Sequence, residues 1–382
     1  MLKVAVGHSN DPDSAEAVQE VLEQCQKSLA GERPQAGLLF AAVDFDHSLI
    51  LNRINEVFPG IELIGGTTDG EISSVLEFQQ DSLTLMVFCA DDIEIRAAVG
   101  RDVHENPIAI AHQTIESIKQ SFATPINFCI ATPESITTNS SSIVQGLKLA
   151  LGSTPVFGGA TADRRDAKHD YQFFKTEVLS DSVPVLLFAG NIMFSHGVAS
   201  GWHPIGKRGI VTKADGNIVY EIDAKPALEF YSYYFEHFTP DAAYPLAVFP
   251  PGEDKFFLRG VNSYDPELGS LTTVGGVPEG STVQIAEASQ EDILTASRSS
   301  FSDAWENYPG EEPAAAIFFS CAWRRWILGS QTGQEYKAIA TYLKQPLPSC
   351  GFYTYGEIAP LRESGQTFFH NTTFATLVIG NR

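Results

Sequence analysis

Three glycine-rich turns carry the side chains that are best placed to do chemistry in this sequence. Each turn follows a predicted strand, and together they are Gly65-Gly-Thr-Thr-Asp-Gly-Glu71, Gly158-Gly-Ala-Thr-Ala-Asp163 and Gly351-Phe-Tyr-Thr-Tyr-Gly-Glu357. Glycine allows positive φ and lets backbone amides approach a small polar ligand closely. The alternative is a tight turn between strands that binds nothing. Phosphate-binding fingerprints are missing from the sequence, because it contains no G-x-x-x-x-G-K-[ST] and no G-x-G-x-x-G that opens a helix.

Two further segments supply polar candidates. Cys321-Ala-Trp-Arg-Arg325 follows an apolar run and is predicted to be a loop. Arg324 or Arg325 is the best candidate for a ligand carboxylate, because a guanidinium group matches it in two-pronged geometry. The alternative is a surface arginine paired with one of the 47 acidic residues. His370 and Asn371 interrupt the final strand, where they either donate to a ligand or form a bulge.

The predicted ligand-binding set combines these segments and contains no metal or cofactor site. Its members are Gly65, Gly66, Thr67, Glu71, Gly158, Gly159, Cys321, Arg324, Arg325, Tyr353, Tyr355, Glu357, His370 and Asn371.

Catalysis would require more than these residues. Cys321 and His370 have the types of a nucleophile and a base, but nothing in the sequence brings them within reach of each other. Glu71 and Glu357 would be paired carboxylates if the turns faced one another. The sequence has no G-x-S-x-G, no H-E-x-x-H and no cluster among its nine histidines. We therefore predict a protein that is not an enzyme.

The three turns belong to three diverged copies of one strand-helix-strand-helix-strand unit. The copies are predicted over 3–100, 106–200 and 283–379 from the order of elements and the position of the turn. Asp11-Pro12, Asn106-Pro107 and Ser289 mark helix starts by capping residues, two of them followed by proline. In α/β sheets of this kind, ligands collect on loops at the carboxyl ends of strands.

Residues 201–280 do not fit the repeated unit. They contain the tight-turn signal Asp215-Gly216-Asn217 and an aromatic-rich helix expected over 226–238. The segment is either an inserted subdomain or a bridge between two halves. We predict an α/β fold with mixed sheets and internally repeated strand-helix-strand-helix-strand units in two domains. Residues 1–200 hold two copies, and residues 201–382 hold the bridging segment and the third copy.

Composition limits the partners and the compartment. The net charge of −22, from 25 basic and 47 acidic residues, argues against nucleic acid or an anionic membrane as a partner. The longest apolar run, 183–194, is broken and too short to span a bilayer, and the first residues lack a signal-peptide core. Five scattered cysteines without a C-x-x-C pair indicate neither zinc nor a disulfide framework. We predict a cytoplasmic protein.

The C-terminal motifs resemble those of the FIST family. They are Phe318-Phe-Ser-Cys-Ala-Trp-Arg324, the run Gly351-Phe-Tyr-Thr-Tyr-Gly-Glu-Ile-Ala-Pro360 and His370-Asn-Thr-Thr373. The first two glycine turns and Gly201-Trp-His-Pro204 match more weakly, so that the resemblance covers nearly the whole chain. Ala162 stands where the other two turns have glycine, and tryptophans at 323 and 326 flank the arginines, which indicates a bulkier pocket.

The resemblance implies a sensory domain of signal transduction that binds a small polar ligand such as an amino acid. No output module follows the last strand in this sequence, so the resemblance implies a separate partner such as a kinase or receptor. Two alternatives stay open. One is a hydrolase or isomerase that uses Cys321 or the pair Glu71 and Glu357, and the other is a ligand-free scaffold for a kinase or receptor.

Overall fold

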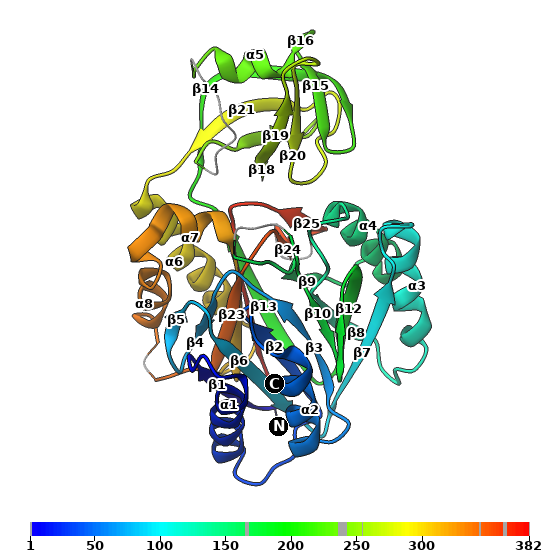
Figure 1. Ribbon diagram of the computed structural model, residues 1–382, viewed down its shortest axis with the longest axis vertical. Coiled ribbons are helices and arrows are strands. Elements are labelled where there is room, and N and C mark those ends of the chain that lie inside the picture. Colours follow the sequence, from blue (N-terminus) through cyan, green and yellow to red (C-terminus); the bar gives the residue numbers. More distant parts are fainter. Residues whose placement is uncertain are drawn as a thin grey trace.

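The protein has a large body of three sheets and a small body of one sheet above it (Figure 1). The computed structural model describes residues 2–164, 168–235, 243–253, 255–343, 345–361 and 365–381. About 39% of the residues are in strands and 25% in helices, which confirms the prediction of an α/β fold with mixed sheets.

Each sheet of the large body has six strands in a row from one edge to the other. The first sheet contains β1 (Lys3–Ser9), β6 (Leu83–Cys89), β2 (Ala36–Ala41), β3 (Glu62–Thr67), β10 (Gln172–Phe174) and β11 (Glu177–Leu179). The second contains β7 (Ile93–Arg101), β12 (Ser182–Gly190), β8 (Ile126–Ala131), β9 (Val156–Gly159), β24 (Glu357–Pro360) and β25 (Thr367–His370). The third contains β13 (Met193–Ala199), β26 (Phe374–Gly380), β22 (Ala315–Cys321), β23 (Ser349–Thr354), β4 (Glu71–Ser73) and β5 (Glu77–Gln79).

The three sheets have one pattern of strand directions. In each, the central pair is parallel (β2·β3, β8·β9 and β22·β23), and the other four pairs are antiparallel. The last two strands of each sheet come from a different part of the chain: β10 and β11 join the first sheet, β24 and β25 the second, and β4 and β5 the third. The sheets therefore exchange strand pairs in a closed cycle.

Helices cover the outer face of each sheet (Figure 1). The first sheet carries α1 (Ser14–Leu29) and α2 (His47–Val57), and the second carries α3 (Pro107–Lys119) and α4 (Ser140–Leu151). The third carries α6 (Gln290–Glu306), α7 (Ala322–Leu328), the short 3-10 helix Gly329–Gln331 and α8 (Gln334–Ala340). Asn106 and Ser289 cap α3 and α6 as predicted, whereas α1 is capped by Asp13 instead of Asp11.

The inner faces of the three sheets share one apolar core. Successive residues of a strand point to opposite faces, so that Leu38 and Phe40 of β2 face this core while Leu39 and Ala41 lie under α1 and α2. Phenylalanines from all three sheets meet in it, and burying each contributes about 2 kcal/mol. They include Phe40, Phe88, Phe128, Phe188, Phe319 and Phe352. The chain ends meet at the far side from the small body, where the backbone N–H of Leu2 donates to Asn381 Oδ1.

The small body is an eight-stranded antiparallel sheet with one short helix. Its elements are β14 (His203–Asp215), β15 (Ile218–Ile222), β16 (Lys225–Pro226), α5 (Ala227–Ser232), β17 (Leu246–Phe249), β18 (Phe257–Arg259), β19 (Val261–Asp265), β20 (Ser270–Thr273) and β21 (Thr282–Glu287). The predicted turn at Gly216 joins β14 to β15 with φ of 57°. The helix expected over 226–238 is shorter than predicted: α5 ends at Ser232, residues 233–235 are not helical, and residues 236–238 lie outside the described residues.

Two expectations about the third unit are wrong. Residues 283–287 do not start it: β21 pairs with β14 in the small body, and β13 occupies the first edge of the third sheet by pairing with β26. The small body is thus inserted after β13. Residues 322–325 are not a loop but begin α7, whose sequence has no glycine or proline to interrupt a helix.

Strand packing explains the first glycine of each turn. Gly65, Gly158 and Gly351 each lie opposite the neighbouring strand of the parallel pair. A Cβ at these positions would lie 1.8, 1.9 and 2.2 Å from the carbonyl oxygens of Leu39, Ala131 and Phe318. No side chain fits at such distances, so glycine is required there by the sheet itself.

We expect Gly158→Ala to destabilise the protein by about 3 kcal/mol or more, because the new Cβ would collide with backbone. Gly152→Ala is the matched control: Gly152 also has positive φ, but nothing lies within 4 Å of its Cβ position. That variant should cost about 1 kcal/mol. Urea unfolding of both variants measures the difference, and equal losses would refute the steric explanation.

Candidate functional site

The three glycine turns meet and are joined by backbone hydrogen bonds. The Ala162 N–H donates to the carbonyl oxygen of Thr67 at 2.8 Å, which joins the second turn to the first. The Ala160 N–H donates to Gly356 at 2.9 Å, and the Asp69 N–H donates to Tyr353 at 2.9 Å, which joins the third turn to both others. We call this closed set the turn ring. These three amides bind protein carbonyls and are not open to a ligand.

Five predicted ligand contacts belong to this ring or to the strands that lead into it. Gly65, Gly66, Thr67, Gly158 and Gly159 are all buried. Thr67 Oγ1 accepts a hydrogen bond of 2.9 Å from the Tyr171 N–H, which ties the first turn to the second unit. These five residues position the elements around them, and none of them lines the pocket between the two bodies.

A buried polar side chain occupies the same place in each sheet, at the start of β4, β10 and β24. Gln172 Oε1 accepts from both the N–H and the hydroxyl of Ser182, at 3.2 and 3.1 Å. Glu71 Oε2 accepts in the same way from Ser82, and Glu357 Oε2 from Thr373 at 2.9 and 2.7 Å. Glu71 and Glu357 therefore bind separate partners, and no hydrogen bond joins them as a catalytic pair.

The second carboxylate oxygen distinguishes Glu357 from Glu71. Glu71 Oε1 accepts from the Thr68 hydroxyl, whereas the corresponding Thr354 donates instead to the carbonyl oxygens of Ala160 and Gly356. Glu357 Oε1 consequently lacks a hydrogen bond of ordinary geometry and faces the Cys321 thiol. Burial raises the pKa of Glu71 to about 7 and the pKa of Glu357 to about 8.

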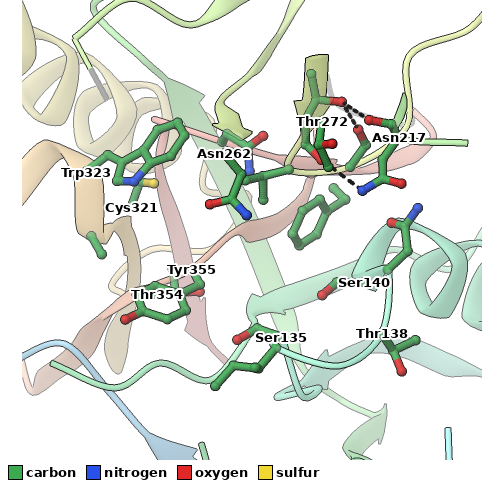
Figure 2. A pocket seen from close by; sticks show the side chains of 18 of the residues that line it. Ser135, Thr138, Ser140, Asn217, Asn262, Thr272, Cys321, Trp323, Thr354 and Tyr355 are labelled. Carbon is green, nitrogen blue, oxygen red and sulfur yellow. Dashed lines mark hydrogen bonds between the residues drawn. The ribbon is translucent and has the colours of Figure 1, made fainter. Parts of the chain in front are cut away.

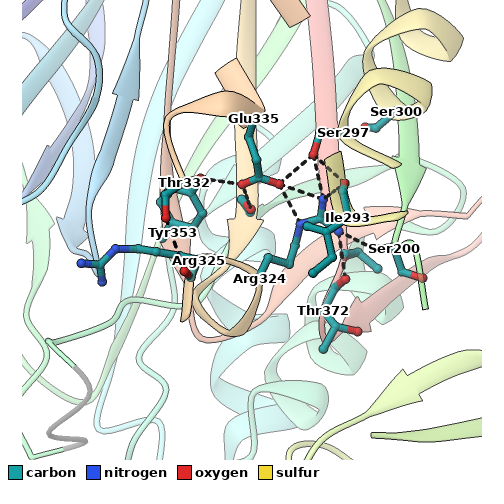
Figure 3. A network of polar contacts seen from close by, with 12 residues as sticks. Ser200, Ile293, Ser297, Ser300, Arg324, Arg325, Thr332, Glu335, Tyr353 and Thr372 are labelled. Carbon is teal, nitrogen blue, oxygen red and sulfur yellow. Dashed lines mark hydrogen bonds and ion pairs between the residues drawn. The ribbon is translucent and has the colours of Figure 1, made fainter. Parts of the chain in front are cut away.

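Arg324 is buried in a network that uses all its donors (Figure 3). Its Nε and Nη2 bind Glu335 Oε1 at 3.1 and 2.8 Å. Its remaining bonds go to one hydroxyl and three carbonyl oxygens, those of Ser297, Ser200, Ile293 and Thr372. Arg324 therefore has no donor left for a ligand, contrary to the expectation from the sequence.

Two other predicted residues also bind within the protein. Tyr353 donates to Glu335 Oε2 at 2.5 Å, behind Arg324. Arg325 turns the other way and pairs with Asp69 of the first turn at 2.7 Å. Both residues hold α7 and α8 against the turn ring.

A cavity of about 630 Å³ lies between the two bodies, above the third glycine turn (Figure 2). The small body contributes Asn217 and Asn262 together with residues 272–275. The large body contributes residues 135–140 before and at the start of α4, the turn from β22 into α7, and the β23–β24 turn. The lining side chains are hydroxyls, amides, aromatic rings, a few aliphatic groups and one thiol, and none of them is charged.

Three sequence-predicted residues line this pocket: Cys321, Tyr355 and Asn371. Tyr355 is held by a hydrogen bond of 2.6 Å from its hydroxyl to Asp163 of the second turn. Asn371 Oδ1 accepts from the Gly260 N–H of the small body at 3.3 Å. His370 lies outside the lining, where its Nε2 pairs with the Ala359 carbonyl at 2.9 Å and burial lowers its pKa to about 4.

Sequence reasoning missed several lining residues. Trp323 stands out in the sequence only by its bulk, yet its ring lies against Gly260, where a Cβ would come within 1.6 Å of it. Trp326 donates from its indole nitrogen to Asp69 at 2.5 Å, and so fixes one aromatic wall. Asn262 and residues 136–140 carry no motif, and the pocket that they line forms only where the small body meets the large one.

A catalytic pair is not assembled among the described residues. Burial, together with the charge of Glu357, raises the pKa of Cys321, which suppresses the thiolate that a nucleophile needs. His370 is bonded elsewhere. No group of three His, Cys, Asp or Glu side chains in the described part of the chain has the arrangement of a metal site.

The fold and the pocket define an α/β protein with a polar pocket between two bodies. The family model for the FIST N domain matches residues 35–225, and the model for the FIST C domain matches residues 227–360. The chain therefore belongs to the FIST family, whose domains are sensory domains. The described helices include none that is long and apolar enough to cross a membrane.

Relatives and solved structures add little about activity. Uncharacterized proteins of Mycobacterium bovis and Mycobacterium tuberculosis are 24% identical over 391 residues, which is 97% of each chain. A cyanuric acid hydrolase from A. caulinodans aligns over 100% of both chains with 9% identity and a TM-score of 0.41. A chorismatase aligns over 99% of this chain and 98% of its own with 9% identity and a TM-score of 0.38. Similarity at these scores carries no argument about this protein.

The raised pKa values of Glu71 and Glu357 predict a dependence of stability on pH. Folded protein keeps these protons to about pH 7 and 8, whereas the unfolded chain releases them near pH 4.5. Because the folded state binds more protons in between, their contribution to stability is lost as pH rises through this window. Gln172 shows that an amide makes the same bonds.

We therefore expect Glu357→Gln, and Glu71→Gln likewise, to be more stable than the unchanged protein at about pH 8 and no more stable at about pH 5. Urea unfolding at both pH values measures this change in slope. Exposed Glu306→Gln serves as the control, with the slope of the unchanged protein. If Glu357→Gln and Glu71→Gln keep that slope, the protonated state of these carboxyls is refuted.

Proposed function

We propose that this protein is a sensor that binds a small polar ligand in the pocket between its two bodies and signals the bound state to a separate protein. The observation that carries the proposal is the composition of the pocket, with uncharged polar groups and aromatic rings around about 630 Å³. Pockets of small molecules typically enclose about 300–1,000 Å³ and combine apolar walls with a few polar groups. An amino acid is one ligand of suitable size.

A pocket shared by two bodies gives a physical route for signalling. A ligand that contacts both Asn262 and Tyr355 binds more tightly when the small body is docked as described than when it is displaced. It thereby shifts the balance between these arrangements by its difference in affinity. A kinase or receptor that contacts both bodies would detect that shift. Because the cysteines are all buried and unpaired, we propose the reducing cytoplasm as the compartment.

Binding without turnover fits the site better than catalysis. The hydrolase or isomerase alternative needs a reactive Cys321 or a carboxylate pair, and the geometry supports neither. The ligand-free scaffold is the remaining alternative, and a ligand screen separates it from the sensor.

We expect at least one compound of a panel of amino acids and other small metabolites to raise the melting temperature. A ligand at a hundred times its Kd stabilises a protein of this size by about 3 °C. Asn262→Ala removes an exposed amide from the pocket wall and should reduce that shift, whereas Asn52→Ala, an exposed asparagine on α2, should not. A panel without any shift, or a shift that Asn262→Ala leaves intact, would contradict the proposal.

A further inference from the structure

We infer that the pocket recognises an anionic group, foremost a carboxylate, at the wall formed by Gly275 and the N-terminus of α4, with Arg259 directly behind it. The inference rests on the proposed function and specifies its ligand class. Two separate features of this wall point to the same chemistry.

The first feature is a buried arginine without an acidic partner. Arg259 ends β18 and is only 5% exposed. Its Nε donates to the Gly276 carbonyl at 3.0 Å, and its Nη1 donates to Leu258 and Phe369 carbonyls at 3.0 Å each. The two N–H groups of Nη2 have no hydrogen-bond partner among the described residues, and no described carboxylate forms an ion pair with this guanidinium. Two of five donors are left for a ligand.

Comparison with Arg324 shows how unusual this is. Both guanidinium groups are buried, but Arg324 has Glu335 as its counterion while Arg259 has only carbonyl oxygens and the ring of Phe257, 4.2 Å away. A buried charge without a counterion is strongly disfavoured. Burial lowers the pKa of Arg259 to about 9, so that the group remains charged at neutral pH. An anionic ligand would offset this cost.

Arg259 lies directly behind the pocket wall. Its Nε and the Ser141 hydroxyl would be 3.0 and 2.8 Å from a Cβ at Gly275, a residue that lines the pocket with φ of 97°. Glycine at this position lets the guanidinium and the hydroxyl reach the wall together. Ser141 Oγ is itself buried and has no hydrogen-bond partner among the described residues. Phe369, whose carbonyl holds Arg259 Nη1, also lines the pocket.

The second feature is the start of a 12-residue helix at the same wall. Asn139 is the N-cap of α4 and Ser140 its first residue, and both line the pocket next to Ser141. The N-terminus of a helix carries partial positive charge, which favours anions. In α4 the Asn139 side chain already accepts from the Ser141 N–H, so the attraction rests on this charge. Among the described residues, no acidic side chain lines the pocket to compete with an anionic ligand.

The rest of the pocket indicates an organic anion. Trp323 lies across the pocket from Ser140 (Figure 2), and Trp326 and Tyr355 supply two further aromatic rings. Aromatic walls favour a planar or apolar ligand body. A carboxylate and a phosphate monoester share the chemistry that Arg259 and α4 would recognise, so the test has to separate them.

Matched pairs of acids and neutral amides test the inference by calorimetry. Suitable pairs are benzoate with benzamide, indole-3-acetate with indole-3-acetamide, and each amino acid with its amide, with phenyl phosphate as the phosphate monoester. We expect an acid to bind and its amide to bind about tenfold more weakly or worse, since hydrogen bonds to charged groups are the stronger ones. Binding of phenyl phosphate in place of the carboxylates would support the anion site and assign it to phosphate.

Substitutions test whether Arg259 causes the preference for acids over amides. Arg259→Gln should weaken the acid about tenfold or more and leave the amide unchanged, whereas Arg208→Gln, an exposed arginine on β14, should change neither. If Arg259→Gln fails to fold, the loss of affinity for the acid is measured with Arg259→Lys and Ser141→Ala instead. Equal binding of acids and amides, or an acid affinity that Arg259→Gln leaves unchanged, would overturn this inference alone. If neither acids nor amides bind, the proposed function fails with it.

Discussion

A ring of hydrogen bonds among three glycine turns holds the large body together. Each turn is bonded to the other two, and each lies where one sheet passes its last two strands to the next. The first glycine of each turn is fixed by the close approach of a parallel strand, with no space for a Cβ. The sheets, the helices on their outer faces and the shared apolar core can all form only around this centre. The glycines are therefore required by the steric fit of the strands, independently of any ligand chemistry.

The pocket arises where the three equivalent positions cease to be equivalent. Glu71 of β4 and Gln172 of β10 have both polar atoms of their side chains bonded within the protein. Glu357 of β24 differs, because Thr354 donates elsewhere and Glu357 Oε1 faces Cys321 at the pocket wall. The inserted small body covers the same end of the third sheet and supplies the opposite wall. Function is therefore expected where the repeated pattern is interrupted.

Local patterns in the sequence were sufficient for most single elements. Asn106 and Ser289 cap α3 and α6 as predicted, since capping residues are local signals. Pairing over long distances was not accessible in this way: the strand at Thr282–Glu287 has the right pattern for the third unit, and only its pairing with β14 assigns it to the small body. That the three units are diverged copies of one another stays a prediction.

The candidate site was less predictable than the fold. Arg324 and Arg325 are neighbours in the sequence, yet one is sealed in a network with Glu335 and the other reaches the first turn. The two side chains point in different directions because they lie on a helix, α7, whereas the sequence predicted a loop there. Arg259 had no signal at all, because a single arginine between apolar residues has meaning only once its missing counterion is seen. Cys321, Tyr355 and Asn371, which do line the pocket, belong to motifs that were recognisable in the sequence.

The exchange of strand pairs also determines the order in which the three sheets can obtain all their strands while the chain is being synthesised. β4 and β5, at residues 71–79, form the edge of a sheet whose central strands begin only at residue 315. When the first sheet has all its strands, after residue 179, the pair of β4 and β5 still lacks its neighbour β23, and the second sheet still awaits β12, β24 and β25. Contacts between residues so distant in sequence form slowly, because the long intervening segment has to be closed first. The ribosome therefore has to release nearly the whole chain before the centre can close, and the nascent protein carries an unpaired strand edge for most of its translation.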